Sequence, residues 1–169
     1  MKIILIGFMG SGKTVFGKKL ANRLNLNFYD LDQYIELKYQ MSIPSIFTNF
    51  DETVFRNMES KELTEFISKD NFILSCGGGT PCFNNNMDLI KTLGISVYIE
   101  LNATALCNRL LNSKTERPLI TGLSPHELQQ KIELLLADRE KYYKQADIVI
   151  SGINLKPSNL IEIIKRWHY

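Results

Sequence analysis

The sequence predicts an α/β fold in which a central five-stranded parallel sheet is flanked by helices. Short apolar runs alternate with stretches of helical periodicity along the 169 residues, and this order is typical of parallel strands connected by helices. The first apolar run leads directly into a glycine-rich turn and a helical pattern, which is where open α/β sheets bind phosphate groups. No internal repeat or linker interrupts the chain, so residues 1–169 are interpreted as a single domain.

Five strands and a series of helices follow from the periodicity. The strands are predicted at 2–6, 28–29, 72–75, 95–100 and 147–150. The helix after the glycine-rich turn carries Phe16, Leu20, Leu24 and Leu26 on roughly one face, and Val15 and Ala21 could extend this stripe. Further helices are predicted at 33–40, 51–68, 84–92, 103–111, 125–145 and 157–167. No extended apolar stripe is left over, which favours a monomer.

Two segments depart from the simple alternation. Two or three helices lie between the second and third strands, across 31–69, although a crossover needs only one. We interpret this insertion as a cap over the phosphate site, where an acceptor substrate binds. Residues 112–124 include Lys114, Arg117 and Gly122 but few large apolar side chains, and are interpreted as a lid loop.

Composition and charge exclude several classes of protein. Hydrophobic residues make up 44% of the chain, which is enough for a buried core. The formal net charge of +2 is too small for a general nucleic-acid binder, so no nucleic-acid partner is expected. No apolar run approaches the length of a membrane span, and no secretory signal is recognised, so we expect a cytoplasmic protein without a membrane partner. The three cysteines form no C-x-x-C pair and are expected to be reduced.

A phosphate-binding P-loop forms the centre of the predicted site. It reads Gly7-Phe8-Met9-Gly10-Ser11-Gly12-Lys13-Thr14, which matches the spacing of a nucleotide-binding loop. Glycines let the backbone turn tightly enough for successive N–H groups to point at phosphate oxygens. Lys13 is expected to reach the β- and γ-phosphates, and Thr14 to offer its hydroxyl to Mg²⁺. The alternative, a chance glycine-rich turn, is disfavoured by the order of strand, loop and helix.

Two further motifs follow strand ends, where open α/β sheets bind ligands. Asp30 and Asp32 would point to different sides of an extended chain, so that one faces a metal ion and the other an acceptor hydroxyl. Considered alone, Asp32 would be a helix N-cap and Asp30 a solvated loop residue. Gly77, Gly78 and Gly79 have no packing value of their own, and a strand end uses such glycines where a ligand or another backbone comes close.

Three arginines complete the set of candidate site residues. Arg56, Arg117 and Arg139 could each be a surface charge that pairs with a nearby acid, worth about a few tenths of a kcal/mol. A kinase that brings ATP to a second anion must, however, neutralise a dense negative charge. Guanidinium groups match the geometry of carboxylates and phosphates.

Together these motifs resemble those of the shikimate kinases over nearly the whole chain. A P-loop alone is shared by many unrelated NTPases. The resemblance to this family depends on four further motifs, which are Asp-x-Asp, Phe-Arg-x-x-Glu, the triple glycine and Arg-Pro-Leu. The resemblance implies a P-loop kinase fold with a helical substrate-binding cap and a lid. It also implies ATP-dependent phosphorylation of the 3-hydroxyl of shikimate, giving shikimate 3-phosphate and ADP, in aromatic amino acid biosynthesis. ATP and Mg²⁺ are the implied cofactors, and shikimate is the implied partner.

Carried over by position, the resemblance implies how the acceptor would be held. Arg56 and Arg139 would bind the carboxylate of shikimate, and residues 77–79 would shape the wall of the same site. Asp32 would align the acceptor hydroxyl and take its proton, while Lys13 and Arg117 stabilise the transferring group.

The resemblance also implies the nucleotide and metal contacts. Thr14 would bind Mg²⁺ directly, and Asp30 would act on it through water. Arg117 would close with the lid onto the phosphates. Arg109 roughly matches an arginine that stacks on adenine in the family, and Lys156 lies near the segment that borders adenine. Backbone and side-chain contacts to ATP would then come from Gly10, Ser11, Gly12, Lys13, Thr14, Val15, Arg109 and Arg117.

The sequence departs from the family pattern at three places, and other functions stay open. Val15 replaces a hydroxyl residue, so one phosphate contact comes from backbone alone, while Gln40 and Asp51 stand where the family often has glycine. A gluconate or nucleotide kinase would share the P-loop and lid. A regulatory GTPase would need an Asn-Lys-x-Asp motif, which is absent from the sequence. A non-catalytic nucleotide-binding module would have no need of Asp32.

Overall fold

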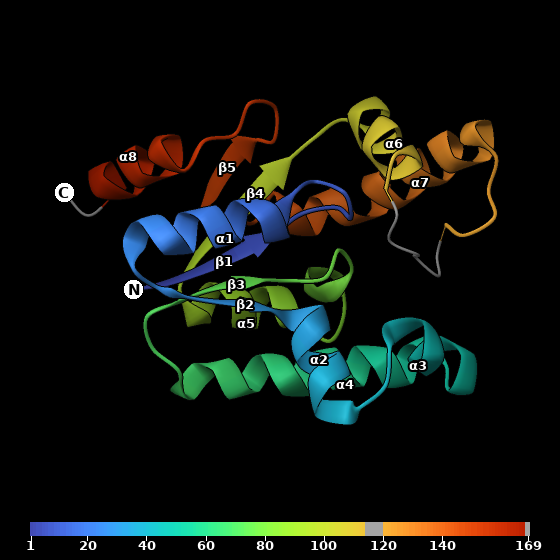
Figure 1. Ribbon diagram of the computed structural model, residues 1–169, viewed down its shortest axis with the longest axis horizontal. Helices are drawn as coiled ribbons and strands as arrows, with labels where there is room; N and C mark the ends of the chain where they lie inside the picture. The colour runs from blue at the N-terminus through green and yellow to red at the C-terminus, as the bar shows by residue number, and fades with distance from the viewer. Residues whose placement is uncertain (114–119, 168–169) are drawn as a thin grey trace.

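The computed structural model describes residues 1–113 and 120–167, and its centre is one parallel sheet (Figure 1). The strands lie in the order β2-β3-β1-β4-β5, and every neighbouring pair is parallel. Their bounds are β1 (Lys2–Ile6), β2 (Asn27–Asp30), β3 (Phe72–Ser75), β4 (Ile95–Glu100) and β5 (Ile148–Ser151). The predicted five-stranded parallel sheet is therefore confirmed. The last strand begins one residue later than predicted, because Asp147 hydrogen-bonds through its side chain to the backbone and hydroxyl of Ser96.

The helices cover both faces of the sheet. Their bounds are α1 (Lys13–Leu24), α2 (Leu31–Tyr39), α3 (Ile43–Asn49), α4 (Glu52–Glu65), α5 (Asn86–Leu93), α6 (Ala103–Leu111), α7 (Pro125–Tyr143) and α8 (Pro157–Trp167). Alternate residues of β1 face opposite sides, so that Ile3 and Leu5 pack with α1 and α8 while Ile4 and Ile6 pack with the other helices. The predicted helix 51–68 ends earlier, as α4 passes into a 3₁₀ turn over Phe66–Ser68.

The stripe on α1 is shorter and narrower than predicted, because the helix ends at Leu24 and Leu26 lies beyond it. Phe16, Leu20 and Ala21 are buried against the sheet, but Val15 is 62% exposed. Val15 lies in the first helical turn and lines the cleft instead of the core. Extending the apolar stripe to Val15 was therefore wrong.

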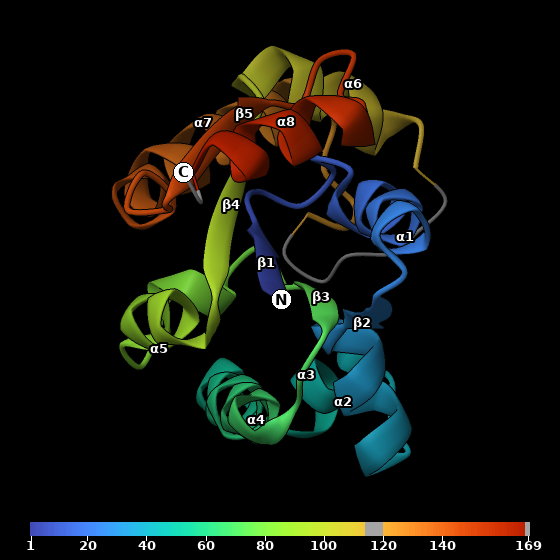
Figure 2. The same cartoon turned by 90° about the vertical axis from the view of Figure 1, so that its left-hand side faces the viewer.

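Helices α2, α3 and α4 form the insertion predicted across 31–69, and they lie beside the edge of the sheet formed by β2 (Figure 2). An ion pair between Lys38 and Glu62 at 2.7 Å joins α2 to α4. The turn after α2 needs a left-handed residue, and Gln40 supplies it at a φ of 52°. Asp51 caps α4 by accepting a hydrogen bond from the N–H of Val54 at 2.9 Å. The two residues that depart from the family pattern are therefore compatible with these turns. Gln40 adopts the left-handed conformation that glycine favours, and Asp51 supplies a helix cap.

The predicted lid, 112–124, is only partly described, because residues 114–119 lie outside the described part of the chain. Arg117 belongs to this segment, so its predicted role is neither supported nor contradicted by the structure. Within the described residues, no helix combines the length and the apolar character needed to cross a membrane.

Candidate active site

A cleft of about 580 Å³ opens at the carboxyl ends of the central strands, between the sheet and the cap. The P-loop, the ends of β2 and β3, the cap helices and α7 all contribute to its walls. Of the sequence-predicted site residues, it is lined by Gly10, Gly12, Lys13, Thr14, Val15, Asp30, Asp32, Arg56, Gly77, Gly78, Gly79, Arg109 and Arg139. Residues from 10 to 139 in the chain therefore meet at one site.

The P-loop depends on glycine for its backbone conformation. Gly7, Gly10 and Gly12 have φ angles of 139°, 81° and 96°, a region that residues with a side chain rarely adopt. The turn folds back so far that the ammonium of Lys13 donates to the carbonyls of Gly7 and Phe8, each at 2.8 Å. A phosphate group that enters the loop would compete with these carbonyls for the ammonium.

Thr14 and Asp30 meet at the floor of the cleft. The Thr14 hydroxyl donates to Asp30 Oδ2 at 2.7 Å. Asp30 is also the N-cap of α2, since its Oδ1 accepts from the N–H of Gln33 at 3.4 Å. The alternative that Asp32 is the cap is therefore wrong. Asp32 instead lies in the first turn of α2, so helical geometry and not an extended chain separates the two carboxylates.

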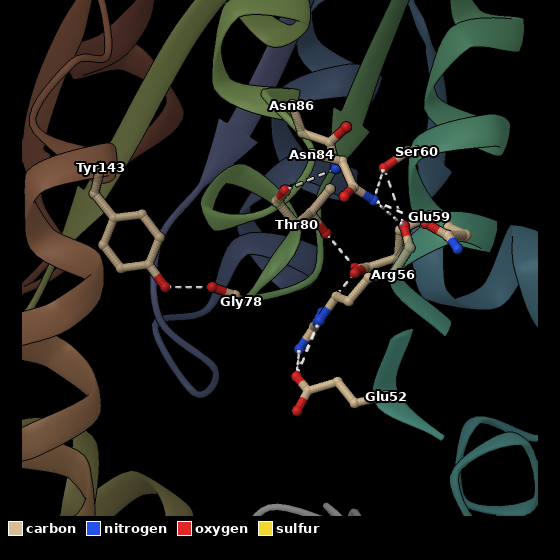
Figure 3. A network of polar contacts seen from close by, with 10 residues as sticks. Glu52, Arg56, Glu59, Ser60, Gly78, Thr80, Asn84, Asn86 and Tyr143 are labelled. Atoms are coloured by element: carbon tan, nitrogen blue, oxygen red, sulfur yellow. Dashed lines mark hydrogen bonds and ion pairs between the residues drawn. The ribbon is translucent and has the colours of Figure 1, made fainter. Parts of the chain in front are cut away.

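Arg56 is the centre of a polar network in the cap (Figure 3). Its side chain is buried, with 5% of the residue exposed, so the alternative of a surface ion pair does not hold. Its Nε and Nη2 donate to Glu52 Oε1 at 3.1 and 2.7 Å, and Nη1 donates to Glu59. Within the described residues these contacts use three of the five guanidinium N–H donors, which leaves two for a ligand. The guanidinium carbon also lies 4.4 Å from the ring centroid of Phe83.

Glu59 was part of a sequence motif but received no role from it. The structure buries its carboxylate completely and places it between the Arg56 guanidinium and the hydroxyl of Thr80, both of which donate to it. Burial raises the pKa of Glu59, while Arg56, Thr80 and Arg139 act in the opposite direction. Its spacing of three residues from Arg56 was the available signal, because residues i and i+3 share a helix face.

The triple glycine leaves room for charged side chains. A Cβ added to Gly77 would lie 2.8 Å from Asp32 Oδ1 and 2.9 Å from Glu59 Oε1. A Cβ added to Gly79 would lie 2.6 Å from both terminal nitrogens of Arg56. None of the three glycines has a positive φ. These positions require glycine for space and not for backbone freedom. Gly78 lies against another backbone as predicted, but at Gly77 and Gly79 the close neighbours are side chains, which the prediction did not include.

Arg139 reaches the cleft from α7. It is 6% exposed, and its guanidinium carbon lies 5.5 Å from the ring centroid of Phe8. Among the described residues, its Nη1 is buried without a hydrogen-bond partner. A buried donor of this kind is costly unless a ligand or water accepts from it, and a positive charge favours an anionic ligand.

Arg109 lines the cleft beside the P-loop and donates hydrogen bonds to backbone carbonyls of two loops. Its Nη1 donates to Ser11 O at 2.9 Å, and its Nη2 donates to Gly152 O at the same distance. The arginine thereby connects the P-loop to the loop that follows β5. The structure places it near the predicted nucleotide site, but its contacts are with the P-loop backbone.

Comparisons with known proteins agree with this arrangement. The protein-family model described as shikimate kinase matches residues 9–167. A shikimate kinase from Azobacteroides pseudotrichonymphae is 43% identical over 162 residues, covering 95% of each chain. The crystal structure of shikimate kinase from Bacteroides thetaiotaomicron has a TM-score of 0.93 at 33% identity, covering 98% of each chain. The shikimate kinase from Acinetobacter baumannii in complex with shikimate has a TM-score of 0.87 at 33% identity, covering 98% of this chain and 91% of that one.

Proposed function

The chain belongs to the shikimate kinase family, and from this premise we propose how its own residues perform the reaction. The enzyme phosphorylates shikimate with ATP, giving shikimate 3-phosphate and ADP, in the biosynthesis of aromatic amino acids. One observation supports our assignment of roles above all others. Two buried arginines, Arg56 and Arg139, border the same cleft as the P-loop.

The acceptor binds between the cap and the triple glycine in this proposal. The two donors that Arg56 has left, together with the buried Nη1 of Arg139, bind the carboxylate of shikimate. Glu52 and Glu59 keep the Arg56 guanidinium in place before the substrate arrives. The absence of side chains at Gly77, Gly78 and Gly79 leaves room for these groups, because a Cβ at any of the three would lie within 3 Å of a neighbouring atom.

The nucleotide binds at the P-loop through the backbone of residues 10–15 and the ammonium of Lys13. Thr14 and Asp30 would hold Mg²⁺, because a hydroxyl and a carboxylate at 2.7 Å from each other are the hard oxygen ligands that this ion prefers. Mg²⁺ bound there would neutralise phosphate charge. Asp32, two residues further along in the first turn of α2, orients the acceptor hydroxyl and accepts its proton. Arg117 would add a cation from the predicted lid, and the segment 31–69 would act as the substrate cap.

A coupled assay of ADP release tests the proposed reaction. The purified protein is given ATP and magnesium with shikimate, gluconate, AMP or no acceptor. We expect strong stimulation by shikimate alone, because the chain belongs to the shikimate kinase family and gluconate and AMP, although also anionic, differ from shikimate in shape. Equal stimulation by another acceptor would contradict the cap assignments, and ADP release without an acceptor would favour a simple NTPase.

A cytoplasmic location and a monomeric state remain further proposals, which rest on the sequence.

Arg109 would support ATP binding through the P-loop and not through adenine. The peptide between Ser11 and Gly12 is trans, so the N–H of Gly12 points away from the Ser11 carbonyl that Arg109 holds, toward the side where a phosphate would bind. We expect Arg109→Gln to weaken binding of ATP, inosine triphosphate and inorganic tripolyphosphate by the same factor, about fivefold. Binding is measured by calorimetry, with Arg23→Gln on exposed α1 surface as the control. A loss confined to ATP would instead indicate stacking on the adenine ring.

A further inference from the structure

Tyr143 connects the last turn of α7 to the triple glycine, although neither the sequence motifs nor the proposed mechanism uses it. Its side chain is completely buried, and its ring packs against Tyr98 with the centroids 5.1 Å apart. Its hydroxyl donates to the carbonyl oxygen of Gly78 (Figure 3). The hydroxyl also hydrogen-bonds with Arg139, so both of these partners border the cleft.

The hydrogen bond determines the direction of one peptide group. In a trans peptide the carbonyl and the following N–H point in opposite directions, and the chain has no cis peptide among its described residues. Since Tyr143 holds the Gly78 carbonyl from the side of α7, the N–H of Gly79 points away from α7. Figure 3 places Tyr143 and Arg56 on opposite sides of Gly78. The N–H of Gly79 is therefore directed to the side on which Arg56 lies.

The surroundings allow little freedom to this peptide. A Cβ added to Gly78 would lie 2.9 Å from the backbone nitrogen of Met9, so the triple glycine packs directly on the P-loop. Arg139 lies one helical turn before Tyr143 on α7, and its Nη1 would be 3.6 Å from the same added Cβ. Tyr143 thus contacts the backbone between the two arginines that are proposed to bind the acceptor.

The surroundings of the Tyr143 hydroxyl favour its protonated form. Burial raises its pKa far above the ordinary value of a tyrosine, and the opposing effect of the neighbouring Arg139 is smaller. Burial therefore favours the protonated hydroxyl, which is the form that donates to the Gly78 carbonyl.

We propose that Tyr143 is a positioning residue for the acceptor: its hydroxyl orients the Gly78–Gly79 peptide so that the Gly79 N–H binds the shikimate carboxylate beside Arg56. The inference rests on the proposed function. In this proposal the carboxylate is bound by a neutral N–H donor in addition to the two arginines. The orientation of the glycine peptide then depends on Tyr143 and not only on the glycines. Because this contact exists both before and during phosphoryl transfer, its loss would weaken binding of shikimate and leave kcat almost unchanged.

The test compares Tyr143→Phe with the wild-type enzyme. The variant keeps the ring and removes only the hydroxyl, so the core stays filled. We expect Kd and KM for shikimate to rise about tenfold, which corresponds to one lost hydrogen bond, while KM for ATP changes less than about twofold. Tyr98→Phe is the matched control, since it removes the hydroxyl of the other ring in the pair. Unchanged constants for shikimate would overturn the proposal.

Further measurements distinguish a positioning role of Tyr143 from a general loss of structure. Equal increases in the constants for shikimate and ATP, or the same effect in Tyr98→Phe, would indicate a structural role and overturn the proposal. If Tyr143→Phe folds poorly, Tyr143→Met supplies a second side chain without a hydroxyl, with all constants measured well below its Tm. Wild-type turnover is measured first. A wild-type enzyme that does not use shikimate would refute the proposed function, whereas a normal wild type with an unaffected Tyr143→Phe refutes only the role of Tyr143.

Discussion

Replacing Asp32 by asparagine is expected to leave the protein folded and to reduce kcat about a thousandfold, which is the loss of a general base. Asp32 lies in the first turn of α2, beside the end of β3, where a Cβ on Gly77 would come within 2.8 Å of its carboxylate. The amide retains the shape and one acceptor oxygen, but it cannot take the proton of the acceptor hydroxyl. Steady-state assays with saturating ATP and shikimate measure the effect, and thermal unfolding checks the fold.

Glu36→Gln provides a matched control for Asp32→Asn. It removes the same charge from the same helix one turn later, and it keeps an oxygen for the hydrogen bond from the N–H of Ile43. We expect this control to retain turnover close to that of the wild type. Turnover of Asp32→Asn near the wild-type level would remove Asp32 from the mechanism.

Gly79→Ala is expected to lower kcat/KM for shikimate about a hundredfold, mainly through KM, without unfolding the protein. The added methyl carbon would lie 2.6 to 2.7 Å from three atoms of the Arg56 guanidinium. This guanidinium has no free room to move, because Glu52 and Glu59 accept its donors and Phe83 lies against its face. Relief of the clash must therefore displace the group that binds the acceptor carboxylate, whereas KM for ATP should change less than about twofold.

A double-mutant cycle tests whether Gly79→Ala acts through Arg56. In an Arg56→Ala background the shortened side chain leaves space for the new methyl group. We therefore expect Gly79→Ala to cost less than about twofold in that background. A full hundredfold cost in both backgrounds would mean that the methyl group disturbs the strand end itself.

The sequence by itself determined the fold class and the centre of the site. The strands of the sheet are apolar runs whose positions follow from local pattern, and β1, β3 and β4 have the predicted bounds. The P-loop was equally readable, because its glycines and Lys13 act within eight consecutive residues. Asp32, Arg56 and Arg139 could be selected as candidates by motif, but pattern alone left a surface ion pair open for each arginine.

Only the tertiary structure decided which contacts those candidates make. The burial of Arg56 and Arg139 depends on how the cap and α7 pack around the cleft. The choice of Asp30 and not Asp32 as the N-cap required the residue at which α2 begins. The hydrogen bonds from Thr80 to Glu59 and from Tyr143 to Gly78 join residues 21 and 65 positions apart. No local periodicity encodes such pairs, because they form only when separate elements pack against the same sheet.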